Sequence, residues 1–236
     1  MIKNLPMAIE KAVKIGTRHS PLAIKQAEEI AAELKKFYPA MRYEIITTET
    51  YGDKDKITPL SEVEGSDFFT REIEEQLLKG EIDFAVHSAK DLPEKLPEGL
   101  LIAVITKSID PYDALVSLGN LLIYELKPNA RIGASSLRRK TQLQKYRADF
   151  QVVDIRGTIQ ERLEKLTEEN LDAIVVAACA LLRLGLEDKI SQRVPFGILA
   201  AHPLQGALAI EVKKDNQELK DWLGVLSLPL NYGHIG

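Results

Sequence analysis

The chain of 236 residues has 45% apolar and 28% charged residues, a balance typical of a globular protein with one or two domains. Its formal net charge of −4 argues against a protein that wraps a polyanion. A single cysteine excludes a disulfide framework and a thiolate-rich metal site, and fits a reducing compartment. The N-terminal residues lack the apolar stretch of a secretory signal, and the longest apolar run, at 173–182, is far shorter than the ~20 residues of a membrane helix. We therefore expect a cytoplasmic chain without a membrane span.

The first half of the chain predicts alternating strands and helices, the pattern of an α/β fold. Ser20 and Pro21 open the first helix, because a serine side chain caps free N–H groups and proline suits the first turn. Gly80 ends the second helix. The elements expected here are strands at 13–16, 43–49, 82–87 and 101–105 and helices at 21–37 and 71–78.

A polar, turn-forming stretch at 106–113 interrupts this pattern and predicts a hinge or linker. A second series of strands and helices follows it, and no segment repeats at a fixed period. The elements expected here are strands at 130–134, 152–155, 173–177 and 207–212 and helices at 135–146, 158–166 and 216–226.

Three turns share one design, in which a strand ends in small residues and a helix begins with basic side chains. They are IGTRHSPLA, IGASSLRRKTQL and VDIRGTIQERL. A helix N-terminus presents unpaired N–H groups and partial positive charge, and arginine forks match carboxylate or phosphate. The pattern favours a ligand with several carboxylates or phosphates, although each arginine alone is as compatible with a solvated face or a structural ion pair. The candidate arginines are Arg18, Arg138, Arg139, Arg156, Arg162 and Arg183.

The segment VHSAKDLP places Asp91 and Lys90 after a predicted strand. A carboxylate beside a cation stays ionised, so Asp91 suits the stabilisation of a developing cation or the transfer of a proton. An aspartate that caps a short turn explains the same residues equally well.

Other chemistries find little support in the sequence. The four histidines are isolated and lack paired-ligand spacing, so we expect no metal. Cys179 lies inside an apolar run and is expected to be a small core residue. The basic cluster at 138–140 lacks interleaved aromatic residues, so we expect no nucleic-acid partner.

Taken as a set, six segments resemble the porphobilinogen deaminase (hydroxymethylbilane synthase) family: TRHSPLAIKQA, VHSAKDLP, IGASSLRRKTQL, DIRGTIQERL, LLRLGL and QGALAIE. The resemblance runs in order from 14 to 226. It implies a transferase of porphyrin, tetrapyrrole and heme biosynthesis, which joins four porphobilinogen units into the linear tetrapyrrole hydroxymethylbilane and releases ammonia at each step. It also implies a dipyrromethane cofactor, porphobilinogen as the small-molecule partner and a monomeric chain.

The resemblance assigns roles to individual residues. Asp91 is the expected catalytic residue, which stabilises the cationic methylene-pyrrolenine formed on deamination. The residues expected to bind substrate or cofactor carboxylates are Arg18, Ser20, Lys90, Ser135, Ser136, Arg138, Arg139, Arg156, Gly157, Arg162 and Arg183. Further candidates are Gln26, Ser88 and Gln205.

The family fold resembles the type II periplasmic binding proteins, in which two domains, each a mixed sheet flanked by helices, enclose an interdomain cleft. It implies a discontinuous first domain at 1–107 plus 206–236 and a second domain at 112–201. Hinges are expected near 108–111 and 202–205.

Three departures from the family pattern bear on function. The segment EVEGSDFF at 62–69 is acidic where the family has a glycine- and lysine-rich lid, and Leu204 replaces a hinge glycine. The family's third domain, which carries the cysteine that attaches the primer, is expected to be absent, and Cys179 does not match that cysteine. Two hypotheses follow. One is a truncated enzyme whose primer binds noncovalently or at another nucleophile. The other is a non-catalytic two-domain module that binds polycarboxylates or pyrroles.

Overall fold

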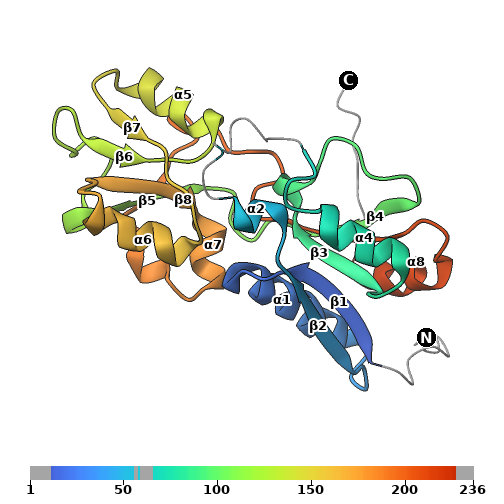
Figure 1. The fold of residues 1–236 in the computed structure, drawn as a ribbon. Helices are drawn as coiled ribbons and strands as arrows, with labels where there is room; N and C mark the ends of the chain where they lie inside the picture. The colour runs from blue at the N-terminus through green and yellow to red at the C-terminus, as the bar shows by residue number, and fades with distance from the viewer. Residues whose placement is uncertain (1–11, 56–57, 59–65, 227–236) are drawn as a thin grey trace, which may run out of the picture.

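The computed structural model describes residues 12–55, 58 and 66–226, and these residues form two lobes, each built on a five-stranded mixed sheet (Figure 1). No helix among them is long and apolar enough to span a membrane. The expectations for the chain start, for 62–65 and for the residues after 226 lie outside the described residues.

The first lobe contains the sheet β2-β1-β3-β10-β4. β1 pairs in parallel with β2 and β3, whereas β10 pairs antiparallel with β3 and β4. Helices α1 and α8 pack on one face of this sheet and α4 packs on the other. The strands are β1 (Val13–Arg18), β2 (Tyr43–Thr48), β3 (Phe84–Ser88), β4 (Leu100–Ile105) and β10 (Leu208–Lys213). The helices are α1 (Pro21–Phe37), α2 (Tyr51–Lys54), α4 (Arg71–Lys79) and α8 (Gln217–Leu223), with 3-10 turns at Ala89–Asp91 and Gly224–Leu226.

The second lobe repeats this arrangement in the sheet β7-β6-β8-β5-β9. β6 pairs in parallel with β7 and β8, and β5 pairs antiparallel with β8 and β9. Helix α5 packs on one face, and α6 and α7 pack on the other. The strands are β5 (Asp113–Ser117), β6 (Arg131–Gly133), β7 (Gln151–Val153), β8 (Ala173–Ala177) and β9 (Gln192–Val194). The helices are α5 (Leu137–Tyr146), α6 (Ile159–Glu168) and α7 (Ala178–Arg183), with 3-10 turns at Leu118–Asn120 and Glu187–Lys189.

Helix α1 shows how local sequence produces these layers. The side-chain oxygen of Ser20 accepts a hydrogen bond from the Ala23 amide, and Pro21 occupies the first turn, as the sequence predicts. Its buried residues recur at helical spacing and cover the sheet. The helix α4 ends at Gly80, whose φ of 72° is the left-handed cap that glycine favours.

The expected strands and helices are present with small shifts at their ends. The helix expected at 135–146 begins at Leu137, because Ser136 is its N-cap, and the helix expected at 216–226 ends at Leu223 and continues as a 3-10 turn. Four elements have no counterpart in the sequence-based expectation: α2, β5, α7 and β9. β5 begins at Asp113, within the stretch expected to be a linker.

Two chain segments cross between the lobes side by side. The Ser108 hydroxyl donates to the carbonyl of Gln205 at 2.7 Å, and the Ile109 amide donates to the carbonyl of Gly206. Gly206 has a φ of 88°, and a Cβ there would lie 2.2 Å from the Ser108 hydroxyl oxygen. The crossings therefore pack too closely for any other residue at 206. The expected domain bounds and hinges stay predictions. The strand order of the first sheet supports them, because β10, which follows the second lobe in the chain, lies in that sheet.

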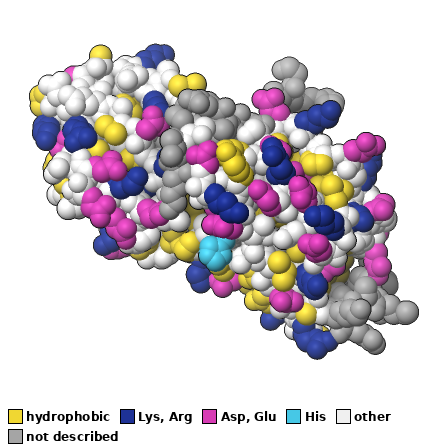
Figure 2. Space-filling model, viewed as in Figure 1, with side chains coloured by type: hydrophobic (Ala, Val, Ile, Leu, Met, Phe, Trp, Pro, Cys, Tyr) yellow, Lys and Arg dark blue, Asp and Glu magenta, His cyan; other side chains and the backbone are white. Residues whose placement is uncertain are grey.

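Basic and acidic side chains are interleaved over the face shown in Figure 2. Such mixing matches the small net charge and gives this face no extended field of one sign.

Candidate functional site

The predicted site residues follow the carboxyl ends of parallel strands, where ligands bind in open α/β sheets. Arg18 ends β1, and Lys90 and Asp91 lie in the 3-10 turn directly after β3. In the second lobe, Ser135 and Ser136 follow β6. The alternation of strand and helix therefore places these residues at the ends of the strands.

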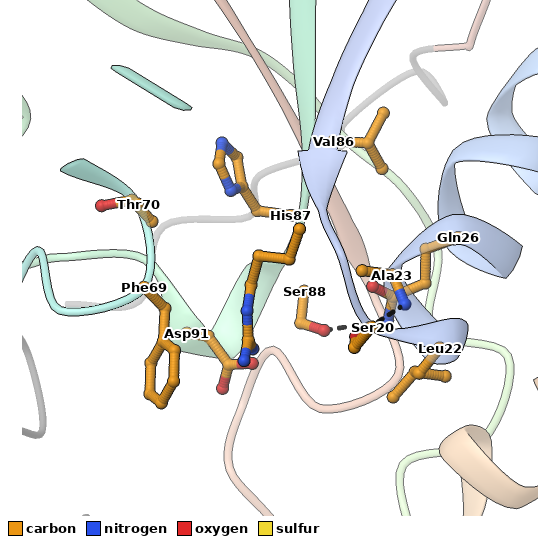
Figure 3. Close-up of a pocket in the computed structure, with 11 residues that line it drawn as sticks. Ser20, Leu22, Ala23, Gln26, Phe69, Thr70, Val86, His87, Ser88 and Asp91 are labelled. Carbon is orange, nitrogen blue, oxygen red and sulfur yellow. Dashed lines mark hydrogen bonds between the residues drawn. The ribbon is translucent and has the colours of Figure 1, made fainter. Parts of the chain in front are cut away.

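A cavity of about 60 Å³ lies at these strand ends in the first lobe. Five of the predicted residues line it, together with Phe69, Thr70 and His87, which the sequence analysis did not select. In Figure 3 the Asp91 carboxylate and the Phe69 ring lie at one end of the cavity, and the His87 ring points away from them. The five predicted residues are Arg18, Ser20, Gln26, Ser88 and Asp91.

Asp91 is exposed, so its carboxylate is open to a ligand. Gln26 and Ser88 also line the cavity, and the side-chain amide of Gln26 donates to the Ser88 hydroxyl at 2.8 Å. Gln26 is buried, so its contribution is to hold β3 against α1.

Arg18 is held by two neighbours. Its guanidinium forms a two-point ion pair with Asp53 and lies 4.2 Å from the centre of the Phe69 ring, a cation–π contact. Desolvation raises the pKa of Asp53, but the hydrogen bond and charge of Arg18, together with two hydrogen bonds from Thr50, hold that pKa below its usual value. Arg18 therefore reaches the cavity in a fixed orientation.

Lys90 meets the crossing segment and the second lobe. Its ammonium donates to Oε1 of Gln205 at 3.4 Å, and the same oxygen accepts from Arg139 at 3.5 Å. The Gln205 amide nitrogen donates to the carbonyl of Pro111 and to Asp113. Desolvation, followed by the charge of Arg139, lowers the pKa of Lys90. Gln205 is fully buried, so it connects the lobes at this point.

Arg138 and Arg139 share a buried carboxylate. Asp113 has no exposed surface and accepts from Arg138 at 2.7 Å and from Arg139 at 2.7 and 3.0 Å. Burial raises the pKa of Asp113, but the charges and hydrogen bonds of the two arginines hold it below 3.8. The side chain of Arg138 stays 21% exposed, whereas that of Arg139 is 6% exposed. Arg138 is thus the more accessible of the two.

Arg156 connects the second lobe to α2 and the residues that follow it. Its guanidinium donates to the carbonyls of Thr58 at 2.6 Å, Asp55 at 2.7 Å and Gly52 at 3.4 Å. Gly52 lies within the short helix α2, Asp55 is its C-cap, and Thr58 follows them in the chain. In Figure 1, α2 accordingly lies between the two lobes.

Arg162 and Gly157 contact each other at the start of α6. Nε of Arg162 donates to the carbonyl of Gly157 at 2.8 Å. Desolvation and the charges of Arg139 and Arg156 lower the pKa of Arg162 to about 10. Thr158 and Glu161 form a capping box that occupies N–H groups of this helix.

The remaining predicted residues serve the framework. The Ser135 hydroxyl donates to the carbonyl of Ile155, and the Ser136 oxygen accepts from the Arg139 amide as the N-cap of α5. Arg183 pairs with Glu29 of α1. Cys179 is buried, as expected for a core residue, and burial raises the pKa of its thiol.

A group of buried ionisable residues lies between α4 and the first sheet. His87 contacts Glu211 at 3.1 Å, and Glu74 of α4 belongs to the same environment. Desolvation and the charge of Glu211 raise the pKa of Glu74. Among the described residues, no group of histidine, cysteine or carboxylate side chains has the arrangement of a metal site.

The charges left without a carboxylate indicate what the site can bind. Within the described part of the chain, no carboxylate lies in ion-pair contact with Lys90, Arg156 or Arg162. The charges of Arg139, Arg156 and Arg18 each lower the pKa of Arg162, whereas that of Asp91 raises it. Three arginines and one carboxylate thus act on Arg162, a balance that fits a ligand with several acid side chains.

Solved structures resemble the chain in fold. A putative methionine-binding lipoprotein from Bacillus subtilis has a TM-score of 0.52 at 10% identity and covers 91% of this chain and 90% of its own. The substrate binding domain of a putative molybdenum ABC transporter from Clostridium difficile has a TM-score of 0.51 at 12% identity and covers 92% and 93%. The chain thus has the two-domain α/β fold of type II periplasmic binding proteins.

The sequence comparisons identify the family. Residues 13–221 match the family model described as porphobilinogen deaminase, dipyromethane cofactor binding domain. The porphobilinogen deaminase of Geobacter metallireducens is 46% identical over 93% of this chain and 69% of that protein. That of Natranaerobius thermophilus is 47% identical over 91% of this chain and 69% of its own. The chain belongs to the porphobilinogen deaminase family.

Proposed function

We propose that the chain is a hydroxymethylbilane synthase-type transferase, which joins porphobilinogen units into a linear tetrapyrrole with Asp91 as its catalytic residue. The observation that carries this is the exposed Asp91 carboxylate, which lines a cavity together with Arg18 and lies next to Lys90 in the turn after β3. Family membership and the names of the relatives support a deaminase over a module that only binds.

The chemistry of each step matches these residues. When the bond between the methylene carbon and the nitrogen of the protonated aminomethyl group breaks, ammonia leaves with the bonding electron pair and the remaining pyrrole becomes cationic. The Asp91 carboxylate stabilises that cation, which the α-carbon of the next pyrrole attacks. The proton lost from this α-carbon is taken up with the released ammonia as ammonium.

Carboxylate side chains of the pyrroles are bound by the cationic residues. Lys90, Arg156 and Arg162 form no ion pair among the described residues, and Arg18 and Arg138 present guanidinium groups that are oriented by Asp53 and Asp113. This donor set fits dipyrromethane, which carries four carboxylates and, when bound, supplies the pyrrole that accepts the first unit. We further propose that the chain acts as a monomer in the cytoplasm, without nucleic acid or membrane.

Substitution of Asp91 by asparagine tests the catalytic assignment. Turnover of porphobilinogen should fall by about 10²- to 10³-fold, because one charge-stabilising group is lost. Affinity measured by titration calorimetry should change little. The matched control is Glu94→Gln in the next turn, an exposed residue, which should leave both quantities unchanged. Equal turnover in the two variants rejects the role of Asp91, and binding without turnover in the parent chain favours the non-catalytic module.

A further inference from the structure

Arg183 and Glu29 form an ion pair that joins the two lobes. Nε of Arg183, in α7, donates to Oε2 of Glu29 at 2.6 Å, and Nη2 donates to Oε1 at 3.1 Å. Glu29 belongs to α1, and α1 and α7 are neighbours where the lobes meet (Figure 1). Two parallel hydrogen bonds between a guanidinium and a carboxylate fix orientation as well as distance. The pair therefore constrains how one helix lies against the other.

The same guanidinium also holds a crossing segment. Nη2 of Arg183 donates to the carbonyl of Gly206 at 3.1 Å. Gly206 packs directly on the other crossing, at Ser108 and Asp110. A single side chain thus connects α7, α1 and the segments between the lobes, which are the parts that must move if the lobes change their angle.

Burial makes this contact different from a surface ion pair. The Arg183 side chain is 3% exposed, whereas that of Glu29 is 31% exposed. Separation of α1 from α7 would break both hydrogen bonds of this pair. Removal of the Glu29 charge while the helices stay in contact would leave a buried guanidinium without a carboxylate, which is strongly unfavourable. Glu29 occupies Nε and Nη2 of Arg183, so a ligand carboxylate could use these two donors only by displacing Glu29.

We propose that Glu29 and Arg183 form an interlobe latch that sets the angle between the two lobes, and that Arg183 acts as a positioning residue while it is paired with Glu29. The latch controls the affinity for porphobilinogen, and in that respect alone it rests on the proposed function. The latch occupies two donors of Arg183, which the sequence analysis assigned to ligand carboxylates. It also adds Glu29, which no sequence motif marks, to the residues that act at the site.

The structural test uses two variants with the same change of charge on the same helix. Glu29→Gln removes the latch, and Glu28→Gln, whose parent residue pairs with Lys25 at the surface, is the control. Small-angle X-ray scattering should show a larger radius of gyration for Glu29→Gln than for Glu28→Gln. Its melting temperature should fall by roughly 3–10 °C, because Arg183 loses its carboxylate. Identical behaviour of the two variants overturns the proposal.

The ligand test gives opposite signs for the two roles of Arg183. If Arg183 is a latch, Glu29→Gln should weaken porphobilinogen binding by about 3- to 30-fold, because fewer molecules hold the binding-competent angle. Arg183→Lys, which replaces the two-point guanidinium contact with a single ammonium, should weaken porphobilinogen binding in the same way. Unchanged or tighter binding in Glu29→Gln means that Glu29 competes with the ligand, and this overturns the latch. If the parent chain binds no porphobilinogen, the proposed function fails, and scattering and melting decide the latch.

Discussion

Asp113 allows the strongest prediction about stability, because a fully buried carboxylate supports two arginines. Asp113→Asn keeps the shape of the side chain and removes its charge. Arg139, which is almost as buried, then loses a compensating charge and faces an amide that cannot accept in the same way. Breaking a buried ion pair by removing one partner costs about 3–5 kcal/mol. For a chain of this size, that corresponds to a loss of roughly 6–20 °C in melting temperature.

Urea denaturation followed by circular dichroism measures this change. The control is Asp188→Asn, which removes a carboxylate paired with Lys189 at the surface and should leave the midpoint unchanged. The pKa of Asp113 is lowered on folding, so its contribution is complete above its unfolded pKa near 3.8 and is lost as pH falls through the folded value. Asp113→Asn should therefore flatten the loss of stability below pH ~4. A midpoint within error of the parent at pH 7 would refute the reasoning.

Three further predictions concern packing and the balance of charge. Gly206→Ala should lower the free energy of unfolding, measured by thermal melts, by about 1–3 kcal/mol or more, because the φ of this residue is positive and a Cβ has no space there. The control Gly224→Ala should be neutral in the same measurement. Leu34→Ala should cost about 2–5 kcal/mol in urea titrations, since Leu34 is fully buried in the first core, and a smaller cost would contradict that packing. Arg162→Gln should weaken porphobilinogen binding by about tenfold in calorimetry without lowering the melting temperature, because desolvation and like charges disfavour the guanidinium when no ligand is bound. A large loss of melting temperature would show that Arg162 is structural.

The fold was predictable where periodicity and caps agree. Helix α1 combines a serine cap, a proline in the first turn and a continuous apolar stripe, and β8 is a short apolar run at the centre of its sheet. The segment β9 has only three residues and no alternation, and β5 begins with an aspartate that resembles a turn residue. Helix α7 continues the apolar run of β8 without a boundary signal. The two sheets share one strand order, yet the sequence contains no detectable repeat, because topology constrains contacts more than residue identity.

Local sequence signals marked the charged candidate residues of the site but not their partners within the protein. The segment around Asp91 and the arginine turns have local signals, since they follow strands and open helices. Asp113 and Glu29 have none, because each meets its arginine only through the tertiary fold. Phe69 lines the cavity and contacts Arg18, but an aromatic residue before a helix is as typical of a core. Sequence patterns thus identified cationic side chains and left open which of them the protein itself neutralises.

Ammonia release from porphobilinogen by the purified chain tests the central claim most directly. The account predicts that one ammonia is released for each porphobilinogen consumed, that a linear tetrapyrrole accumulates, and that Asp91→Asn reduces both rates together. Porphobilinogen that binds to the parent chain while no ammonia is released would contradict the account, and would assign the cavity around Asp91 to binding alone.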